Sequence, residues 1–249
     1  MKSVLITGAT NGLGASLTAQ FAQAGLDVIA IGRKPRENAN MPDGVRYIRA
    51  DFAKVDDVTD LVEEIGHCPD CIVPAAVGYP HQDILFTDVA ELESYYRVNA
   101  LIPIALCGEL LERRKPDQFA AAIFIGSEST FTAHRGSALY ASTKAALRVL
   151  YQGLADANRS KNAAVSMLML GPLANEKKLS ELSAVAKKKG LSDADITKLF
   201  LRKSNRNLVI DALIDFESCR TCIEHVFSLG PIANGMMCRL DGGSSGSLI

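Results

Sequence analysis

Residues 7–14 read Thr7-Gly8-Ala9-Thr10-Asn11-Gly12-Leu13-Gly14. An apolar run, Ser3–Thr7, leads into them, and the pattern from Leu13 to Ala24 is that of an amphipathic helix. Glycines in such a turn let the backbone approach a pyrophosphate, whose charge the free amides at the helix N-terminus would bind. This context favours a nucleotide-binding loop over a glycine-rich turn without a ligand. The residues expected to contact the nucleotide here are Gly8, Thr10, Asn11, Gly12, Leu13 and Gly14.

The same alternation of short apolar runs and helical patterns continues along the chain. The predicted strands are Ser3–Thr7, Asp27–Ile31, Val45–Ala50, Cys71–Ala75, Ala121–Ile125, Val165–Leu170 and Met236–Leu240. The predicted helices are Leu13–Ala24, Asp56–Ile65, Val89–Arg113, Ser137–Asn158 and Glu217–Ser228. Strands that are apolar almost throughout are typical of a parallel sheet covered on both faces. The chain is therefore predicted to be an α/β protein, a Rossmann-type doubly wound parallel sheet of about seven strands.

One stretch does not follow this alternation. Residues 175–210 are strongly charged and helical in pattern, and they lie between the sixth and seventh predicted strands. We find no internal repeat and no low-complexity linker, so we expect a single domain over residues 1–249 with a helical insertion at about 175–210.

Composition narrows the class of partner. The chain has 249 residues, 22% of them charged, and a formal net charge of −1, which gives no reason to expect nucleic acid or a membrane surface. No apolar run is long enough to span a bilayer. Lys2 is followed at once by a core strand rather than a leader, and the six cysteines show no export context, so we expect a cytoplasmic protein with reduced thiols.

The end of the second predicted strand bears on the choice of dinucleotide. It reads Ile31-Gly32-Arg33-Lys34, with glycine where an acid would bind the two ribose hydroxyls of NAD. An arginine can bind a 2′-phosphate through two hydrogen bonds. We interpret Arg33 and Lys34 as a preference for NADP(H) over NAD(H), the alternative being two solvated side chains in a surface loop. After the third strand, Asp51 with Phe52 beside it is a candidate for the adenine, or Asp51 caps the next helix.

A possible catalytic pair lies on the predicted helix after the fifth strand. Tyr140 and Lys144 are separated by four residues, which places a phenol and an ammonium on one helix face. An ammonium beside the phenol would favour the phenolate and lower its pKa from about 10. Ser127 ends the fifth strand, at the edge where ligands bind in doubly wound sheets. Asn99 lies inside a predicted helix, where asparagine is unfavourable, so it has either a hydrogen-bonding duty at the site or a capping or core-amide role.

Together these residues resemble the classical short-chain dehydrogenases/reductases. The glycine loop, Asn99, Ser127, Tyr140 and Lys144 occur in that family's order and approximate spacing, and Asp241-Gly242-Gly243 resembles its C-terminal signature. The resemblance implies that Ser127 holds the substrate oxygen and that Tyr140 exchanges its proton. It also implies that Lys144 binds the nicotinamide ribose and lowers the tyrosine pKa, and that Asn99 positions a water that relays protons.

The sequence departs from the family pattern after two strands. The fourth strand, which usually ends Asn-Asn-Ala-Gly, ends here in Pro74-Ala75-Ala76-Val77-Gly78, so cofactor packing at Ala75 and Ala76 is expected to be atypical. The usual Pro-Gly after the sixth strand becomes Gly171-Pro172, and Asn175 stands where a threonine normally touches the nicotinamide amide. By the same resemblance, Pro172, Leu173 and Asn175 are expected to contact the cofactor.

The resemblance implies an oxidoreductase that interconverts a carbonyl and a secondary alcohol, assembled as a homodimer or homotetramer, and Arg33 with Lys34 predicts that its cofactor is NADP(H). A nucleotide-sensing or scaffold protein that has lost turnover is the alternative, motivated by the altered fourth-strand loop. An epimerase or dehydratase of the wider superfamily fits less well, because its glycine spacing usually differs.

The insertion carries nine basic and four acidic residues, a net of +5, which would attract an anionic substrate unless these are only solvated helix faces. The basic residues are Lys177, Lys178, Lys187, Lys188, Lys189, Lys198, Arg202, Lys203 and Arg206, and the acidic ones are Glu176, Glu181, Asp193 and Asp195.

Two CxxC pairs, Cys68/Cys71 and Cys219/Cys222, are more consistent with core residues than with a zinc site, and no metal is expected. Polar and aromatic residues after strands four and five border the expected crevice without a role assigned to any one of them. They are Tyr79, His81, Glu128, Ser129 and His134.

Overall fold

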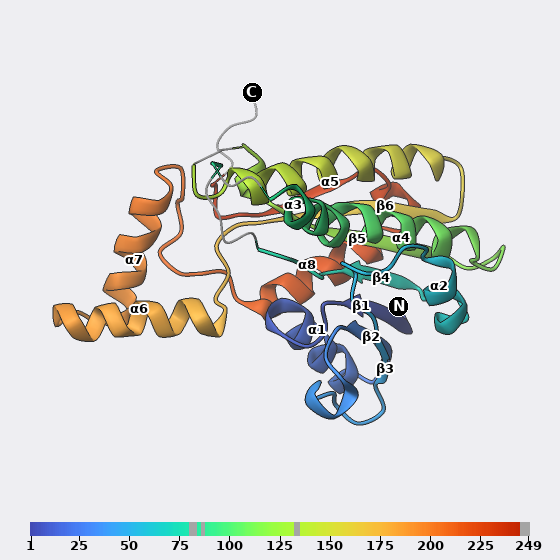
Figure 1. Cartoon of the computed structure of the whole chain (residues 1–249), viewed down its shortest axis with the longest axis horizontal. Helices are drawn as coiled ribbons and strands as arrows, with labels where there is room; N and C mark the ends of the chain where they lie inside the picture. Colours follow the sequence, from blue (N-terminus) through green and yellow to red (C-terminus); the bar gives the residue numbers. More distant parts are fainter. Residues whose placement is uncertain (80–83, 86–87, 132–134, 245–249) are drawn as a thin grey trace.

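The computed structural model describes residues 1–79, 84–85, 88–131 and 135–244. Within them, strands form one parallel sheet in the order β3-β2-β1-β4-β5-β6-β7 (Figure 1). The strands are β1 Ser3–Thr7, β2 Asp27–Gly32, β3 Arg46–Arg49, β4 Cys71–Pro74, β5 Ala120–Ser127, β6 Ala163–Leu170 and β7 Met237–Leu240. The order reverses direction between β1 and β4, which creates the crevice where doubly wound sheets bind ligands. The predicted fold class is confirmed, with strand ends displaced by one or two residues.

Helices cover both faces of this sheet. They are α1 Gly12–Gln23, α2 Thr59–Ile65, α3 Val89–Tyr96, α4 Ile102–Glu112, α5 Ala138–Ala157, α6 Glu176–Lys189, α7 Asp193–Ser204 and α8 Phe216–Ser228. Alternate strand residues face opposite sides: Leu5 packs with Leu110 and Leu147 of α4 and α5, whereas Ile6 packs with Phe21 of α1 and Ile223 of α8. Figure 1 shows the same two layers, with α4 and α5 on one side of the sheet and α1 and α8 on the other.

The long helix predicted from Val89 to Arg113 contains a π-helical turn. A π-helical turn at Arg97–Leu101 separates α3 from α4, and the buried Asn99 lies within it. The predicted helical stretch is confirmed from Val89 to Glu112, but the π-helical turn inside it was not predicted, because apolar periodicity does not register one extra residue in a turn. Such π-turns are often found at functional sites.

The insertion forms a helical hairpin that projects from the body of the sheet (Figure 1). Helices α6 and α7 pack through Leu182, Ala186 and Ile196, a small cluster separate from the two main ones. The hairpin returns to the C-terminal segment, where the Asn205 side chain donates to the carbonyl of Ser244 at 2.8 Å. None of the helices in the described part of the chain is long and apolar enough to cross a bilayer.

Candidate active site

The structure brings Ser127 and Tyr140 together. Ser127 is the last residue of β5 and is 8% exposed, while Tyr140 lies in the first turn of α5, which starts one short loop later. The two side chains lie close enough for Ser127 to act on the pKa of the Tyr140 phenol. A hydroxyl and a phenol are thus placed beyond the carboxyl end of a central strand, where both can reach one substrate oxygen.

Lys144 lies one helical turn after Tyr140 and is 3% exposed. Its ammonium donates to the backbone carbonyl of Ile125 in β5 at 2.9 Å. Burial lowers the pKa of Lys144 to about 8, because a charge loses its hydration in the protein interior. The lysine therefore lies against the strand beneath Ser127.

Burial also dominates the phenol of Tyr140. It raises the pKa of Tyr140 well above its usual range, the neighbouring Tyr79 and Glu128 act in the same direction, and the hydrogen bond with Ser127 opposes them. The sequence expectation of a pKa lowered by Lys144 is not met in this structure, where the lysine donates to Ile125 instead. The ring of Tyr79 stacks on that of Tyr140 with centroids 5.0 Å apart, so Tyr79 forms one wall of the site.

Asn99 connects the π-turn to the atypical loop after β4. Its side-chain oxygen accepts from the amide of Gly78 at 2.7 Å, and its amide group donates to the Gly78 carbonyl at 2.9 Å and to Thr143 Oγ1 at 3.0 Å. These contacts are those of a core amide, the alternative that the sequence left open. Asn99 thereby connects the loop after β4 to Thr143 of α5, the residue directly before Lys144.

The glycine loop packs against itself and against the β4 loop. A Cβ on Gly14 would lie 2.4 Å from the carbonyl oxygen of Gly8, and one on Gly8 would lie 2.7 Å from Cα of Ala76. Asn11 begins α1 as its N-cap and accepts from the amide of Gly12 at 2.8 Å. At Gly12 a Cβ would meet nothing within 4 Å, so the tip of the loop is open.

We expect Gly14→Ala to destabilise the protein by about 2–3 kcal/mol, because the new methyl overlaps backbone that cannot move independently. Gly153→Ala is the matched control: it lies on the exposed side of α5 with nothing within 4 Å of its Cβ position. That change should stabilise the protein by about 0.5–1 kcal/mol through helix propensity. Urea unfolding of both variants measures the difference, and equal stabilities would contradict the packing described for Gly14.

The tip of β2 has no room for an acid. Gly32 pairs with Arg49 of β3, and a Cβ on Gly32 would lie 2.6 Å from the Thr10 methyl and 3.0 Å from the hydroxyl of Tyr47. Beyond it Arg33 and Lys34 are exposed. Tyr47 donates to the Lys34 carbonyl at 2.6 Å and Arg49 to the Arg33 carbonyl at 3.3 Å, so β3 supports this basic loop.

The Asp51 side chain has its hydrogen-bond partner two residues further along the chain. Its carboxylate accepts from the amide of Ala53 at 3.2 Å, which closes a turn after β3, and Phe52 beside it is buried in the core. The capping alternative for Asp51 is wrong, because α2 begins at Thr59 with Val58 as its N-cap, whereas Asp51 closes a turn directly after β3.

The residues after β6 also have structural partners. Pro172 accepts from the amide of Ile214 at 2.9 Å, and Leu173 forms a bridge with the same residue. Asn175 is the N-cap of α6, its side-chain oxygen accepting from Lys178 at 2.9 Å. Only the amide nitrogen of Asn175 is left without a described partner, so a contact with a cofactor would use that group.

Many of the basic residues on the hairpin have local roles. Lys198 pairs with Asp211 at 2.8 Å, and Lys178 pairs with Glu181 at 3.0 Å while lying over the ring of Phe200. Three lysines in the last turn of α6 complement the helix dipole; they are Lys187, Lys188 and Lys189. The solvated-face alternative thus accounts for much of this charge.

The cysteines lie apart from the site. Burial raises the pKa of Cys68 and of Cys219 to about 12, which keeps both thiols protonated at neutral pH. Within the described residues no group of three or more His, Cys, Asp or Glu side chains is placed to hold a metal.

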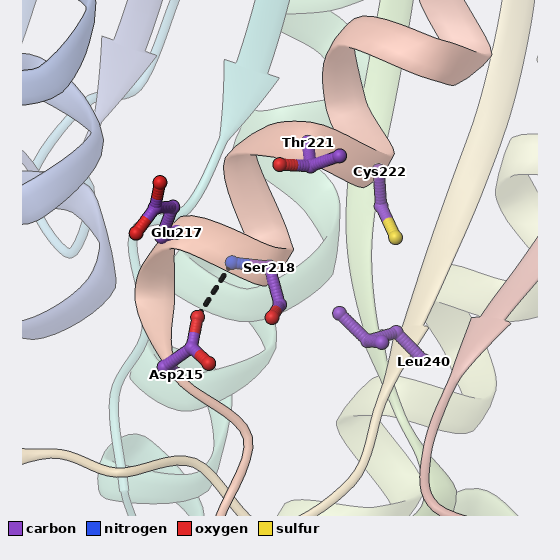
Figure 2. A pocket seen from close by; sticks show the side chains of 6 residues that line it. All are labelled: Asp215, Glu217, Ser218, Thr221, Cys222 and Leu240. Carbon is purple, nitrogen blue, oxygen red and sulfur yellow. Dashed lines mark hydrogen bonds between the residues drawn. The ribbon is translucent and has the colours of Figure 1, made fainter.

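A shallow hollow at the start of α8 includes Cys222 (Figure 2). Its lining contains none of the residues predicted for the site, and Asp215 within it caps α8 by accepting from Ser218 at 2.6 Å. We assign this hollow no function.

Three residues near the site had no assigned role in the sequence. Tyr47 and Arg49 lie two residues apart in β3, and only the parallel register shows that they meet the tip of β2. Glu128 follows Ser127 directly, so the sequence placed it next to the site, but its hydrogen bond with Ser127 could not be predicted from the sequence. Of the crevice residues named from the sequence, His81 and His134 lie outside the described residues.

Comparison with known proteins assigns the family. The family model described as short chain dehydrogenase matches residues 2–183. The oxidoreductase YvrD of Bacillus subtilis (strain 168) is 26% identical over 257 residues, covering 99% of this chain and 97% of its own.

Two solved structures share the fold. A short chain dehydrogenase family protein from Francisella tularensis subsp. tularensis SCHU S4 has a TM-score of 0.80 at 20% identity and covers 99% of this chain and 100% of its own. A 4-hydroxyisoleucine dehydrogenase complexed with NADH has a TM-score of 0.77 at 20% identity, with the same coverage of both chains. The matched residues span the glycine loop, Ser127, Tyr140 and Lys144. The chain belongs to the short-chain dehydrogenase family of oxidoreductases.

Proposed function

We propose that the chain is an NADP(H)-dependent oxidoreductase that interconverts a carbonyl and a secondary alcohol, with Tyr140 as its acid and base. The observation that supports this most directly is the meeting of Ser127 and Tyr140 beyond the end of β5, with the buried Lys144 one turn further on. Turnover of NADPH with a panel of small ketones and aldehydes tests the proposal, and a chain that reduces none of them contradicts it.

The residues of the glycine loop fit a dinucleotide. The open tip at Gly12 and the N-terminus of α1 suit a pyrophosphate, and the exposed Arg33 and Lys34 suit a 2′-phosphate. When bound, the nicotinamide would supply or accept the hydride at the substrate carbon. The residues proposed to line its path are Ala75, Ala76, Pro172, Leu173 and Asn175.

The proton chemistry belongs to the chain itself. In the direction of reduction Tyr140 gives its proton to the substrate oxygen as the alkoxide develops, and the Ser127 hydroxyl donates a hydrogen bond to the same oxygen. Burial keeps the phenol protonated beforehand, because it raises the pKa of Tyr140. The Lys144 ammonium, whose pKa of about 8 leaves it mostly charged at neutral pH, stabilises the phenolate left behind and binds the nicotinamide ribose.

We propose that Asn99 keeps α5, with Tyr140 and Lys144, in place relative to the loop after β4, because its side chain is hydrogen-bonded to both Gly78 and Thr143. A water that relays protons would bind at the remaining lone pair of its side-chain oxygen. We also propose that residues 1–249 act as one domain whose α6–α7 hairpin covers the substrate, and that the enzyme is cytoplasmic and works as a homodimer or homotetramer. Binding of an anionic substrate at the hairpin stays a prediction from its net charge.

The cofactor preference has a direct test. Wild type should bind NADPH at least ten-fold more tightly than NADH, about 1.4 kcal/mol, and Arg33→Ala should remove that preference, because the guanidinium is the group that distinguishes a phosphate from a hydroxyl. Arg36→Ala is the matched control, an exposed arginine three residues along the same loop. Fluorescence titration measures all the affinities. Equal affinity of the wild type for both cofactors, or an unchanged preference in Arg33→Ala, would refute the assignment.

A further inference from the structure

Glu128 lies beside the residue that would hold the reacting oxygen. It follows Ser127 and begins the short helical turn Glu128–Phe131 at the carboxyl end of β5. The Ser127 hydroxyl donates to Glu128 Oε2 at 3.3 Å and lies 2.9 Å from the hydroxyl of Ser129. A carboxyl group therefore borders the same space as Ser127, at the distance of one long hydrogen bond.

The surroundings of this carboxyl do not satisfy its charge. It is partly buried, and in the part of the chain that the structure describes it forms no ion pair. Burial raises the pKa of Glu128, Asp241 adds to the rise, and hydrogen bonds with its own backbone and Ser127 oppose it. A half-buried carboxylate with few donors gains most from a ligand that brings a donor.

Two phenols also border this part of the site. Burial raises the pKa of both Tyr79 and Tyr140, whose stacked rings border the site, and the Glu128 carboxylate raises it further. A substrate whose oxygen lies between Ser127 and Tyr140 would present its adjacent carbon to this carboxyl. A plain ketone would leave Glu128 without a new partner, whereas a donor on that carbon would complete its hydrogen bonding.

We propose that Glu128 determines specificity by accepting a hydrogen bond from a donor group on the carbon next to the reacting carbon. The substrate class is then an α-hydroxycarbonyl with its vicinal diol, or an α-aminocarbonyl with its amino alcohol. The proposal rests on the proposed function, since Ser127 and Tyr140 must bind the reacting oxygen. It adds a substrate feature that the family machinery alone does not require.

The test compares three ketones of one carbon skeleton: the plain ketone, the α-hydroxyketone and the α-aminoketone. Wild type should show a kcat/KM at least ten-fold higher for one of the two donor-bearing ketones than for the plain ketone. Glu128→Ala should lower that value, mainly through KM, by a factor at least ten times larger than the factor by which it lowers kcat/KM for the plain ketone. Glu63→Ala, an exposed glutamate on α2, is the control and should change none of the values.

A second variant identifies the donor. Glu128→Gln keeps a hydrogen-bond acceptor but loses the negative charge. If the donor is a hydroxyl, the α-hydroxyketone should keep most of its higher kcat/KM over the plain ketone in this variant. If the donor is an ammonium, the α-aminoketone should lose its higher kcat/KM as fully as in Glu128→Ala. If Glu128→Ala instead lowers all three substrates by one factor, Glu128 only positions Ser127 and the proposal is wrong. A wild type without preference for either donor-bearing ketone also overturns it.

Binding separates this proposal from the proposed function. If wild type turns over none of the three ketones, the proposed function fails, and calorimetry on the NADPH-loaded chain still tests Glu128. Glu128→Ala should then weaken binding of the vicinal diol or the amino alcohol by a factor at least ten times larger than the factor by which it weakens binding of the plain alcohol. Equal binding to both chains would refute the role of Glu128 by itself.

Discussion

Tyr140→Phe is expected to lower kcat by about 10²–10⁴-fold while leaving the affinity for NADPH within about two-fold, because it deletes one transferable proton and little volume. Neither Ser127 nor Lys144 is expected to replace this phenol, because the serine hydroxyl is a much weaker acid and the Lys144 ammonium is hydrogen-bonded to Ile125. Stopped-flow or steady-state oxidation of NADPH, with fluorescence titration of the cofactor, measures both quantities.

Tyr151→Phe is the matched control for Tyr140→Phe. Tyr151 lies on the same helix, is 1% exposed and directs its hydroxyl toward the Gly235 carbonyl at 3.4 Å, so its loss should leave turnover unchanged. Full activity of Tyr140→Phe would exclude the proposed acid. A wild type that binds NADPH but reduces no carbonyl compound would instead favour a nucleotide-sensing or scaffold protein.

Lys144→Met is expected to abolish turnover and yet make the protein more stable. The pKa of Lys144 is about 8 in the folded protein, against 10.5 for the free side chain, because burial disfavours the ammonium. At pH 7 the cost of holding that charge inside is on the order of 3 kcal/mol. Methionine removes this cost but also removes the hydrogen bond to Ile125, which contributes about 1 kcal/mol to stability. The expected net increase in the free energy of unfolding is therefore about 2 kcal/mol.

The pH dependence gives this prediction a second measurement. Between pH 8 and 10.5 the unfolded chain binds more protons at this lysine than the folded one, so the contribution of Lys144 to wild-type stability rises with pH in that window. The advantage of Lys144→Met should therefore shrink by about 1 kcal/mol between pH 7 and pH 9. Urea unfolding of both chains at the two pH values measures it. A variant that is less stable than wild type at both would show that the ammonium is better compensated than its contacts indicate.

Much of the fold followed from local pattern. Ser3–Thr7 and residues 7–14 carry their own strand, turn and helix signals, since apolar periodicity and glycine spacing act over a few residues. The positions of Ser127 and Tyr140 could be predicted as neighbours for a related reason, because a strand end and the start of the next helix are separated by only a short loop.

The contacts of the site side chains were not predictable in this way, because each partner is distant in the chain. The Asn99 side chain is hydrogen-bonded to Gly78, and that of Lys144 to Ile125. The space that a side chain at position 32 would need is occupied in part by Tyr47 of the neighbouring strand. The π-turn around Asn99 likewise does not follow from a helical period of apolar residues.

The sequence by itself determined the doubly wound sheet, the glycine loop and the set of residues that meet at its edge, because local hydrophobic period and turn chemistry specify elements and their order. Only the tertiary structure decided what each of those side chains binds and how its proton is held. Burial raised the pKa of Tyr140 and lowered that of Lys144, against what their separation along one helix face suggested. Desolvation depends on every element packed around a group, and that surrounding exists only once the chain has folded.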